Sequence, residues 1–310
     1  MKTMLLVGNF GVGNLGDEEL KRYFIQRYPH VHWRVICARP QASKELCRLP
    51  CGIRSFFAFS WIATIKAYWN CDGVVFGGGS LFTDIESPKA CLLWWIHAVP
   101  AYIFRKPIHL AFQGIGPWKT SIGIYLSTSV CRMATSISVR DISSFERVKN
   151  MQLHKKCVLS CDPVYWLIKK EKTDCSSQNV LILIPRNNSS DKFIIAMENA
   201  YKSNTWSAIR VISMKPYDNS ESEFCQMIID KYYKSAKLLK ITSLGEILQN
   251  IKDSGLVVSE RYHGALAALT LGKPVEIITQ SDDDKLCSLQ GVDILQWDSL
   301  LSAGEELLGL

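Results

Sequence analysis

The stretch from Val257 to Thr279, VVSERYHGALAALTLGKPVEIIT, constrains the fold more than any other part of the chain. An apolar run at its start predicts a buried strand, and the alanine- and leucine-rich run after His263 has the spacing of a helix. A turn at residues 272–274 then leads to a second apolar run. The order of strand, polar loop, helix and strand predicts a βαβ unit whose loop contains Arg261 and His263.

This loop is a favourable place for an anionic ligand. In open α/β sheets, ligands collect at the carboxyl ends of strands, and the amino termini of helices favour anions. We therefore expect Arg261 to bind a ligand or to hold the loop in place. The neighbouring Glu260 is expected to be solvated or paired with Arg261.

The length and composition of the chain suit two domains. The chain has 310 residues, of which 47% are hydrophobic, so it can bury a large core. Strands alternate with helices in both halves, which predicts two doubly wound Rossmann-like domains that face each other across a cleft. The polar stretch of residues 169–178 predicts a boundary between residues 1–168 and residues 169–310.

Charge and cysteine usage restrict the environment of the protein. A net charge of +7 is spread along the chain without a basic block, which favours anionic ligands or an anionic membrane surface over nucleic acid. The first apolar run is too short for a signal peptide, so we expect a cytoplasmic location and reduced cysteines. Because His154, Cys157 and Cys161 lack the pair spacing of a metal site, we expect no metal there.

The first glycine-rich loop raises the alternative of a dinucleotide-binding fold. The string GVGNLG, residues 11–16, matches GxGxxG between a predicted strand and a predicted helix. However, the next strand ends in ARP, residues 38–40, where a ribose-binding acid is expected. Asp17 and Glu18 also put negative charge where a pyrophosphate would lie. Both observations count against a nicotinamide or flavin site.

A glycine triplet follows the predicted strand at residues 74–76. The sequence Gly77-Gly78-Gly79-Ser80 can bring backbone amides close to an anion, or it can form a tight strand-to-helix turn. We favour the first interpretation, with Gly78, Gly79 and Ser80 as ligand contacts. Asp84 lies just beyond, as a site carboxylate or as a cap.

Two more strand ends carry polar residues. A strand at residues 107–112 ends at Gln113, next to a glycine-bearing turn. A short strand near residues 137–139 delivers Arg140 and Asp141, and Ser143 can cap the helix that follows. Adjacent opposite charges are often a solvated pair, but at a strand end Arg140 is equally suited to binding an anion.

Residues 92–104, LLWWIHAVPAYIF, form the most hydrophobic segment, which is too short to span a bilayer. We expect a buried core helix. The alternative is an interfacial patch in which Trp94 and Trp95 lie at the level of lipid headgroups, next to a basic surface.

Six strings occur in order along the chain and together resemble the polysaccharide pyruvyl transferase family: GNFGVGNLGDEEL, VVFGGGSLFTD, FQGIGP, ISVRDISS, CDPVYWL and VVSERYHGALAALTLGKP. The resemblance covers nearly the full length and implies a GT-B-like fold. It also implies an enzyme that moves the enolpyruvyl part of phosphoenolpyruvate onto a sugar of a cell-surface polysaccharide or its lipid-linked precursor, forming a pyruvate ketal. By this similarity, the residues around phosphoenolpyruvate are Asn14, Arg140, His263 and Lys285.

The chemistry of this reaction fits the residue types. Phosphoenolpyruvate carries a carboxylate and a phosphate, so its site needs cations in fixed positions, and Arg140, Arg261 and Lys285 are candidates. A histidine can act as acid or base near neutral pH. We predict that His263 and Arg140 are catalytic, with His263 as the general acid to the methylene carbon; the alternative is that His263 caps its helix. The reaction needs no cofactor or metal beyond the donor substrate.

Two rival functions stay open. A nucleotide-sugar glycosyltransferase of GT-B type would need a carboxylate for the ribose, for which Glu246 and Glu276 are the best candidates. A binding protein without activity would be expected to lack the cationic site residues, yet the sequence retains Arg140, Arg261, His263 and Lys285. The sequence does not identify the acceptor sugar. It is compatible with a homo-oligomer and with a peripheral contact with the inner face of the plasma membrane.

Overall fold

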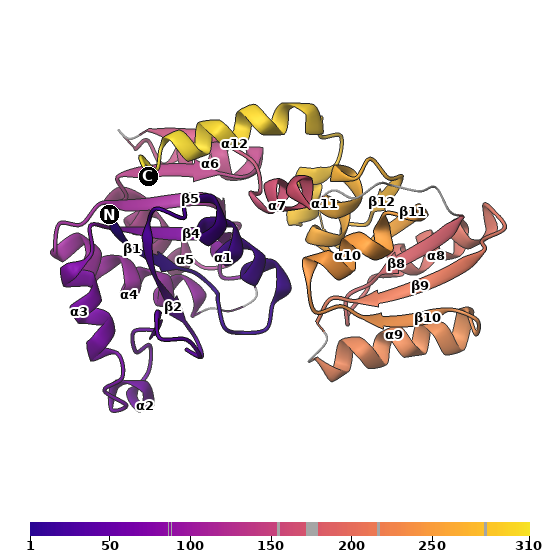
Figure 1. Ribbon diagram of the computed structural model, residues 1–310, viewed down its shortest axis with the longest axis horizontal. Coiled ribbons are helices and arrows are strands. Elements are labelled where there is room, and N and C mark those ends of the chain that lie inside the picture. The colour runs from indigo at the N-terminus through magenta and orange to yellow at the C-terminus, as the bar shows by residue number, and fades with distance from the viewer. Residues whose placement is uncertain (86, 88, 154–155, 172–178, 216–217, 282–283) are drawn as a thin grey trace. The chain divides into compact units, whose positions relative to one another are not determined.

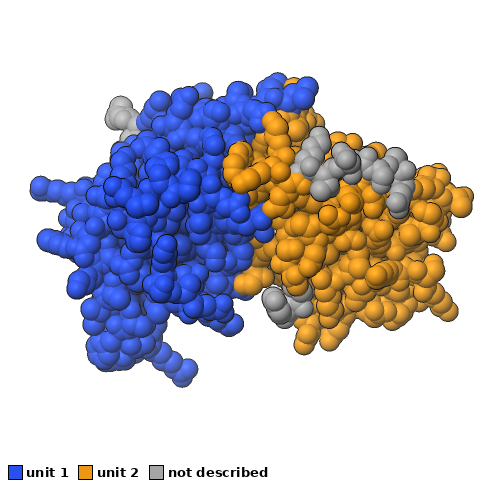
Figure 2. Space-filling model, viewed as in Figure 1, with its two compact units in different colours: residues 1–12, 16–163, 295–310 blue, residues 13–15, 164–294 orange. Residues whose placement is uncertain are grey.

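A computed structural model describes residues 1–85, 87, 89–153, 156–171, 179–215, 218–281 and 284–310. The chain divides into two compact units, coloured separately in Figure 2. Unit 1 comprises residues 1–12, 16–163 and 295–310, and unit 2 comprises residues 13–15 and 164–294. Each unit contains its own parallel sheet (Figure 1), which confirms the predicted α/β class with two doubly wound domains.

Unit 1 contains a seven-stranded sheet in the order β3-β2-β1-β4-β5-β6-β7. Every pair of neighbouring strands is parallel. The direction of winding reverses at β1 and β4, which is where ligands bind in open sheets of this kind. The strands are β1 (Thr3–Val7), β2 (His32–Cys37), β3 (Glu45–Cys47), β4 (Gly73–Phe82), β5 (Ile108–Ile115), β6 (Ser136–Val139) and β7 (Cys157–Leu159).

Two of the helices that connect these strands, α5 and α6, begin at a side chain that caps the first turn. Asp141 accepts a hydrogen bond from Ser144 N at 2.7 Å and caps α6, so the prediction of Ser143 as the cap was wrong. Asp141 has the extended backbone conformation of an N-cap residue, whereas Ser143 already lies inside the first turn of α6. The helices are α1 (Leu15–Arg27), α2 (Ile53–Phe56), α3 (Ile62–Asn70), α4 (Ala90–Ile103), α5 (Ser121–Met133) and α6 (Ile142–Asn150).

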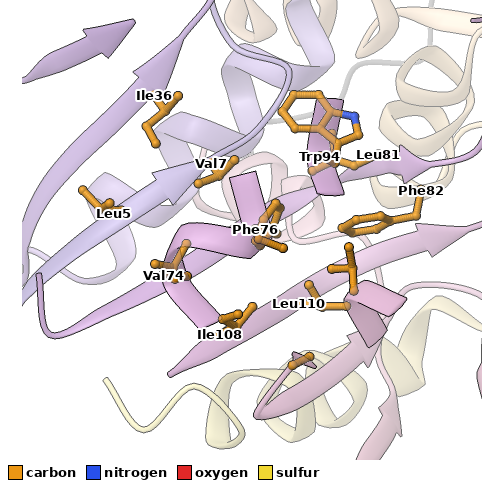
Figure 3. Packing of buried hydrophobic residues seen from close by; sticks show 14 of the residues in the cluster. Leu5, Val7, Ile36, Val74, Phe76, Leu81, Phe82, Trp94, Ile108 and Leu110 are labelled. Atoms are coloured by element: carbon orange, nitrogen blue, oxygen red, sulfur yellow. The ribbon is translucent and has the colours of Figure 1, made fainter. Parts of the chain in front are cut away.

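The apolar segment of residues 92–104 forms α4 and packs into the core of unit 1, as predicted. Figure 3 shows Trp94 among buried side chains such as Phe76 and Leu81 from the sheet. Trp94 is 3% exposed, so it is not available to a membrane surface. Trp95 is half-buried against the same core, and its Nε1 donates to Ser129 Oγ at 3.2 Å.

Unit 2 contains a five-stranded parallel sheet in the order β10-β9-β8-β11-β12. Its core is formed by buried side chains of the sheet together with α8 and α9. The strands are β8 (Val180–Ile184), β9 (Ala208–Ser213), β10 (Lys237–Lys240), β11 (Ser254–Ser259) and β12 (Val275–Ile277). The helices are α7 (Val164–Lys170), α8 (Asp191–Lys202), α9 (Asn219–Tyr232), α10 (Leu244–Ile251) and α11 (Tyr262–Thr270), followed by the short helices η1 (Lys285–Leu289) and η2 (Ile294–Gln296).

The last helix, α12 (Trp297–Glu306), belongs to unit 1, whereas the boundary predicted from the sequence placed it in the second domain. Glu305 accepts hydrogen bonds from Tyr23 Oη and Arg27 Nε, both at 2.6 Å. Gly304 allows a close approach, since a Cβ there would lie 2.5 Å from Ser160 Oγ. Helix α7 groups with unit 2, so the boundary that the sequence placed after residue 168 lies after Pro163. Residues 172–178 of the predicted linker lie outside the described residues.

Among the described residues, every helix is too short or too polar to cross a membrane. Six of the described cysteines are buried, where a free cysteine packs as a small hydrophobic residue: Cys37, Cys71, Cys91, Cys131, Cys161 and Cys225.

Candidate functional site

The carboxyl edge of the unit 1 sheet brings together residues from β4, β5 and β6. Gly79 is paired with Gln113 across β4 and β5, and Gln113 is paired with Val139 across β5 and β6. Arg140 follows directly after β6, and its backbone N–H donates to the carbonyl of Gln113 at 3.1 Å. The register of the sheet therefore places Ser80 and Arg140 on neighbouring positions of the same edge.

The guanidinium of Arg140 is held by two partners. Its Nη1 donates to Asp162 Oδ2 at 2.6 Å, and its Nη2 donates to Ser80 Oγ at 2.9 Å. The side chain of Arg140 is 4% exposed and that of Asp162 is 0% exposed, so the ion pair is buried. A Cβ at Gly114 would lie 2.7 Å from Ser80 Oγ, so a side chain there would displace the hydroxyl that Arg140 contacts.

Asp162 was missed by the sequence analysis, although it is the second residue of the string CDPVYWL. It lies shortly after β7, at the edge where Arg140 follows β6. A charge buried at a strand end needs a partner of opposite charge, which predicts a carboxylate near Arg140 but does not say which one.

Gln113 is fully buried and lies within β5, not in the turn after it. Its Nε2 donates to the carbonyl oxygens of Phe76 at 2.8 Å and Ala111 at 3.2 Å. Within the described residues, Oε1 has no hydrogen-bond partner. The amide thus joins β5 to β4, and its role as a ligand contact stays a prediction.

The glycine triplet lies inside β4, where we expected a loop. Gly78 and Gly79 have φ values of 79° and 81°, in the region that favours glycine. A Cβ at Gly78 would lie 2.9 Å from Leu20 of α1, and one at Gly79 would lie 3.3 Å from Asp17 Oδ1. The glycines therefore let α1 pack closely over β4, and their contact with a ligand stays a prediction.

Two acids in the first turn of α1 bind polar groups of the loop that precedes the helix. Glu18 Oε1 accepts from Gly11 N at 2.7 Å, and Asp17 Oδ2 accepts from Asn9 Nδ2 at 3.0 Å. An amide that a carboxylate already binds is a poor partner for a pyrophosphate, which supports the argument against a dinucleotide. Asn14 is exposed, one residue before α1.

Asp84 is not a free carboxylate, and it is not the cap of a helix either, because the N-cap of α5 is Thr120, whose hydroxyl donates to Asp84. Its oxygens accept from Lys119 N at 2.6 Å and from Thr120 N at 3.0 Å. Burial alone would raise the pKa of Asp84, but the hydrogen bonds from Thr120 and Lys119 lower that pKa below its ordinary value. Asp84 thereby holds the chain that enters α5.

In unit 2, Arg261 occupies the position before the first residue of α11 and forms an ion pair with Glu221 of α9. Glu221 is fully buried, and its Oε1 accepts from Met214 N and Lys215 N, both at 2.9 Å. The side chain of Arg261 is 18% exposed. The carboxylate thus joins α9, the end of β9 and the start of α11.

The expectation that Glu260 is solvated or paired with Arg261 was wrong. Glu260 is fully buried, and its Oε1 accepts from Ser190 Oγ at 2.6 Å and from Ser190 N at 3.1 Å. Successive residues at the end of a strand point to opposite faces, so Glu260 reaches α8 while Arg261 reaches α9.

Arg186, which follows β8, was also missed by the sequence analysis. Its Nε donates to the carbonyl of Glu260 at 2.8 Å, and its Nη2 contacts Asp284 Oδ1 at 3.3 Å. Arg186 therefore ties the ends of β8 and β11 to the segment just before Lys285. The string PRN at the end of a predicted strand was the available indication.

His263 is the second residue of α11 and is half-buried. Its ring lies edge-on to that of Tyr262, with the ring centroids 5.3 Å apart. A Cβ at Gly264 would lie 2.7 Å from Ile184 of β8, so glycine lets α11 pack closely on the sheet and fixes the place of His263. Lys285 is exposed and begins η1, beyond the carboxyl end of β12.

Several of the predicted residues form one group in each unit, whereas Asn14 and Lys285 are placed in neither group. Unit 1 gathers Ser80, Gln113 and Arg140 at one sheet edge, and unit 2 gathers Arg261 and His263 at the start of α11. Asp282 and Asp283, which precede Lys285, and His154 of the rejected metal cluster lie outside the described residues.

Solved structures show the same fold at low sequence identity. The UDP-GlcNAc 2-epimerase of Neisseria meningitidis bound to UDP-GlcNAc is 10% identical with a TM-score of 0.60, covering 100% of this chain and 92% of that chain. The UDP-GlcNAc 2-epimerase of Methanocaldococcus jannaschii is 13% identical with a TM-score of 0.58, covering 100% and 93%. These likenesses confirm the GT-B-like fold class.

Sequence comparisons identify the family. The amylovoran biosynthesis protein AmsJ of Erwinia amylovora is 21% identical over 205 residues, which are 62% of this chain and 48% of AmsJ. The match therefore spans about half the length of that relative. The profile described as polysaccharide pyruvyl transferase matches residues 14–282. The chain thus belongs to the polysaccharide pyruvyl transferase family.

Proposed function

We propose that this protein is a pyruvyltransferase that acts in polysaccharide biosynthesis. The donor is phosphoenolpyruvate, the acceptor is a sugar of a cell-surface polysaccharide or of its precursor, and the products are a pyruvate ketal and inorganic phosphate. The family match over residues 14–282 carries this proposal. The group at the start of α11 supports it, because a cation, a histidine and a helix amino terminus lie within three consecutive residues.

The start of α11 suits an anionic donor. The first turn of a helix presents backbone N–H groups and partial positive charge, which attract a carboxylate or phosphate. Arg261 adds a guanidinium, and its side chain is 18% exposed. In the proposed site, Arg261 and the first turn of α11 hold one anionic group of the donor.

His263 follows two residues later and moves the proton. His263 protonates the methylene carbon of the donor while one sugar hydroxyl attacks the adjacent carbon. That hydroxyl passes its own proton to the imidazole. The second hydroxyl then displaces phosphate, which leaves with that hydroxyl's proton. One donor and one diol thus give one ketal and one phosphate.

Arg140 has a positioning role in this proposal. Because its guanidinium is buried against Asp162 and Ser80, it holds the ends of β4 and β6 at fixed positions. Asn14, the glycines of β4, Gln113 and Lys285 stay candidate substrate contacts, and the reaction is expected to need no cofactor.

The test uses the purified protein, phosphoenolpyruvate and a panel of methyl hexosides with neighbouring hydroxyls. We expect release of phosphate in step with a new ketal methyl resonance, and a loss of about a hundredfold or more in rate for His263→Ala. His30→Ala is the matched control, since His30 is exposed and lies outside the candidate groups. An unchanged rate for His263→Ala would remove His263 from the mechanism.

The rival glycosyltransferase function is tested by ligand stabilisation. Its candidate carboxylates are poorly suited, because Glu246 accepts from Thr242 N at 2.8 Å and Glu276 lies within β12 and not at its end. Only a ligand of the folded state raises the melting temperature. Stabilisation by UDP-GlcNAc and not by phosphoenolpyruvate would replace our proposal with the rival.

A further inference from the structure

Unit 1 exposes large apolar side chains on α2, on α3 and in the loop between them. Ile53 is 81% exposed, Phe57 is 65% exposed and Trp69 is 64% exposed. Figure 1 shows α2 beyond the amino end of α3, at the periphery of unit 1. We call this region the α2–α3 surface and define it by Ile53, Phe57, Phe59, Ile62, Trp69 and Tyr102. Single exposed apolar residues are ordinary, but a group of this size marks an interaction site.

The periodicity of α3 places its exposed residues on one outer face. Ile62, Lys66 and Trp69 are spaced by four and three residues and are exposed, whereas Ala67 and Tyr68 are buried against the core. The rings of Trp69 and Phe104 contact each other with centroids 5.2 Å apart. This contact joins the end of α3 to the end of α4, where Tyr102 is also exposed. The apolar face is therefore continuous across two helices.

Basic residues dominate the charge of this region, although the exposed Asp72 lies two residues after α3. The sequence contains no aspartate or glutamate in residues 46–71 or in residues 87–140, whereas both signs are mixed elsewhere in the chain. Arg54, Lys66 and Arg105 are exposed among the apolar residues. A protein partner can match such a face only with a complementary acidic and apolar patch, whereas an anionic lipid surface provides both properties over its whole area.

We propose that the α2–α3 surface docks on a membrane that contains anionic phospholipids. Trp69 and Tyr102 would lie at the level of the headgroups, which these two residue types favour. Phe57 and Phe59 would enter the apolar region below, and Arg54, Lys66 and Arg105 would contact lipid phosphates. This surface replaces the one expected from the sequence, because Trp94 is buried in the core. The inference does not depend on the proposed pyruvyl transfer.

The test is co-sedimentation of the full chain with vesicles of phosphatidylcholine alone, or with about one third phosphatidylglycerol. We expect binding to the anionic vesicles that weakens at high salt, since surface charges are then screened. The triple variant Ile53→Ser, Phe57→Ser, Phe59→Asn should lower the bound fraction about tenfold or more. Asn suits position 59 because the backbone there has a φ of 54°.

A matched control removes exposed apolar residues from unit 2. Ile195→Ser, Tyr201→Ser and Met227→Ser alter side chains that are also exposed, and this variant should bind vesicles like the original protein. Circular dichroism should show both variants folded. Equal vesicle binding by the first variant and the original protein would overturn the proposal. So would a dimer of the original protein in solution that the first variant loses, since the surface would then join two copies.

Discussion

Two arginines follow strands of the two sheets, and both are paired with a fully buried carboxylate from another element. Arg140 after β6 is paired with Asp162 and bonded to Ser80, and its side chain is 4% exposed. Arg261 after β11 is paired with Glu221, and its side chain is 18% exposed. The same chemistry therefore produces an enclosed ion pair in unit 1 and an ion pair whose arginine side chain is partly exposed in unit 2.

The largest loss in the free energy of unfolding is expected when the buried carboxylate of one of these ion pairs is neutralised. Asp162→Asn leaves the charge of Arg140 buried without a counterion, which should lower the free energy of unfolding by about 3–5 kcal/mol. Glu221→Gln should cost less, about 1–3 kcal/mol, because Arg261 can rehydrate and the amide oxygen can still accept a hydrogen bond. Urea unfolding of the two variants measures both values. An equal loss would mean that the difference in exposure has no energetic consequence.

The second prediction concerns the binding of the donor. Each double variant removes both charges of one ion pair. Arg261→Gln with Glu221→Gln should weaken binding of phosphoenolpyruvate about tenfold or more, since a hydrogen bond to a charged group is lost. Arg140→Met with Asp162→Asn should weaken it less, because the Arg140 guanidinium is buried. Titration calorimetry measures both affinities, and circular dichroism checks folding. A larger loss for the Arg140 double variant would instead make Arg140 the direct contact of the donor.

Acid is expected to destabilise unit 1 more than unit 2, because unit 1 buries a neutral histidine. His97 is fully buried, with Leu49 N donating to Nε2 at 3.2 Å and Nδ1 lying 2.9 Å from Tyr68 Oη. Since Nε2 accepts, the proton of the neutral ring is on Nδ1 and faces Tyr68 Oη. Burial, with a smaller contribution from the charge of Arg48, lowers the pKa of His97 to about 3.

The sign of this pH effect follows from the lowered pKa. Above the unfolded pKa of about 6.5 the ring is neutral in both states, and below it only the unfolded state binds the proton. Stability should therefore fall as the pH decreases from about 6.5 towards 3, by about 2 kcal/mol at pH 5. Hydrogen exchange at pH 7 and at pH 5 should show this loss in α4. An equal loss throughout unit 2, where His263 is the one histidine in the sequence, would contradict the assignment to His97.

The positions of the strand ends could be predicted from the sequence, whereas the ion pairs formed at these ends could not. The apolar runs before Arg140 and Arg261 are local patterns, so β6 and β11 could be placed from the sequence. Asp162 and Glu221 come from other elements, and their choice depends on the tertiary packing, which local patterns do not contain. The expected pairing of Arg261 with the adjacent Glu260 failed for this reason.

The glycine triplet and the last helix show the same limit. Glycines 77–79 have low strand propensity, yet they lie inside β4 because α1 packs directly over them. Helix α12 returns to unit 1 through Glu305, which bonds Tyr23 and Arg27 near the other end of the chain. Contacts over such sequence separations cannot be read from periodicity alone.

The smallest predicted effect concerns Ser80, the neutral third partner that distinguishes the Arg140 cluster from the Arg261 cluster. Ser80→Ala removes the acceptor 2.9 Å from Arg140 Nη2 but keeps the ion pair with Asp162. The loss in the free energy of unfolding should be about 1 kcal/mol, which is typical of one hydrogen bond. Urea unfolding of the single variant, of Asp162→Asn and of the double variant measures the coupling. If the two losses simply add, Ser80 and Asp162 contribute independently, and they do not act together as one coupled cluster around Arg140.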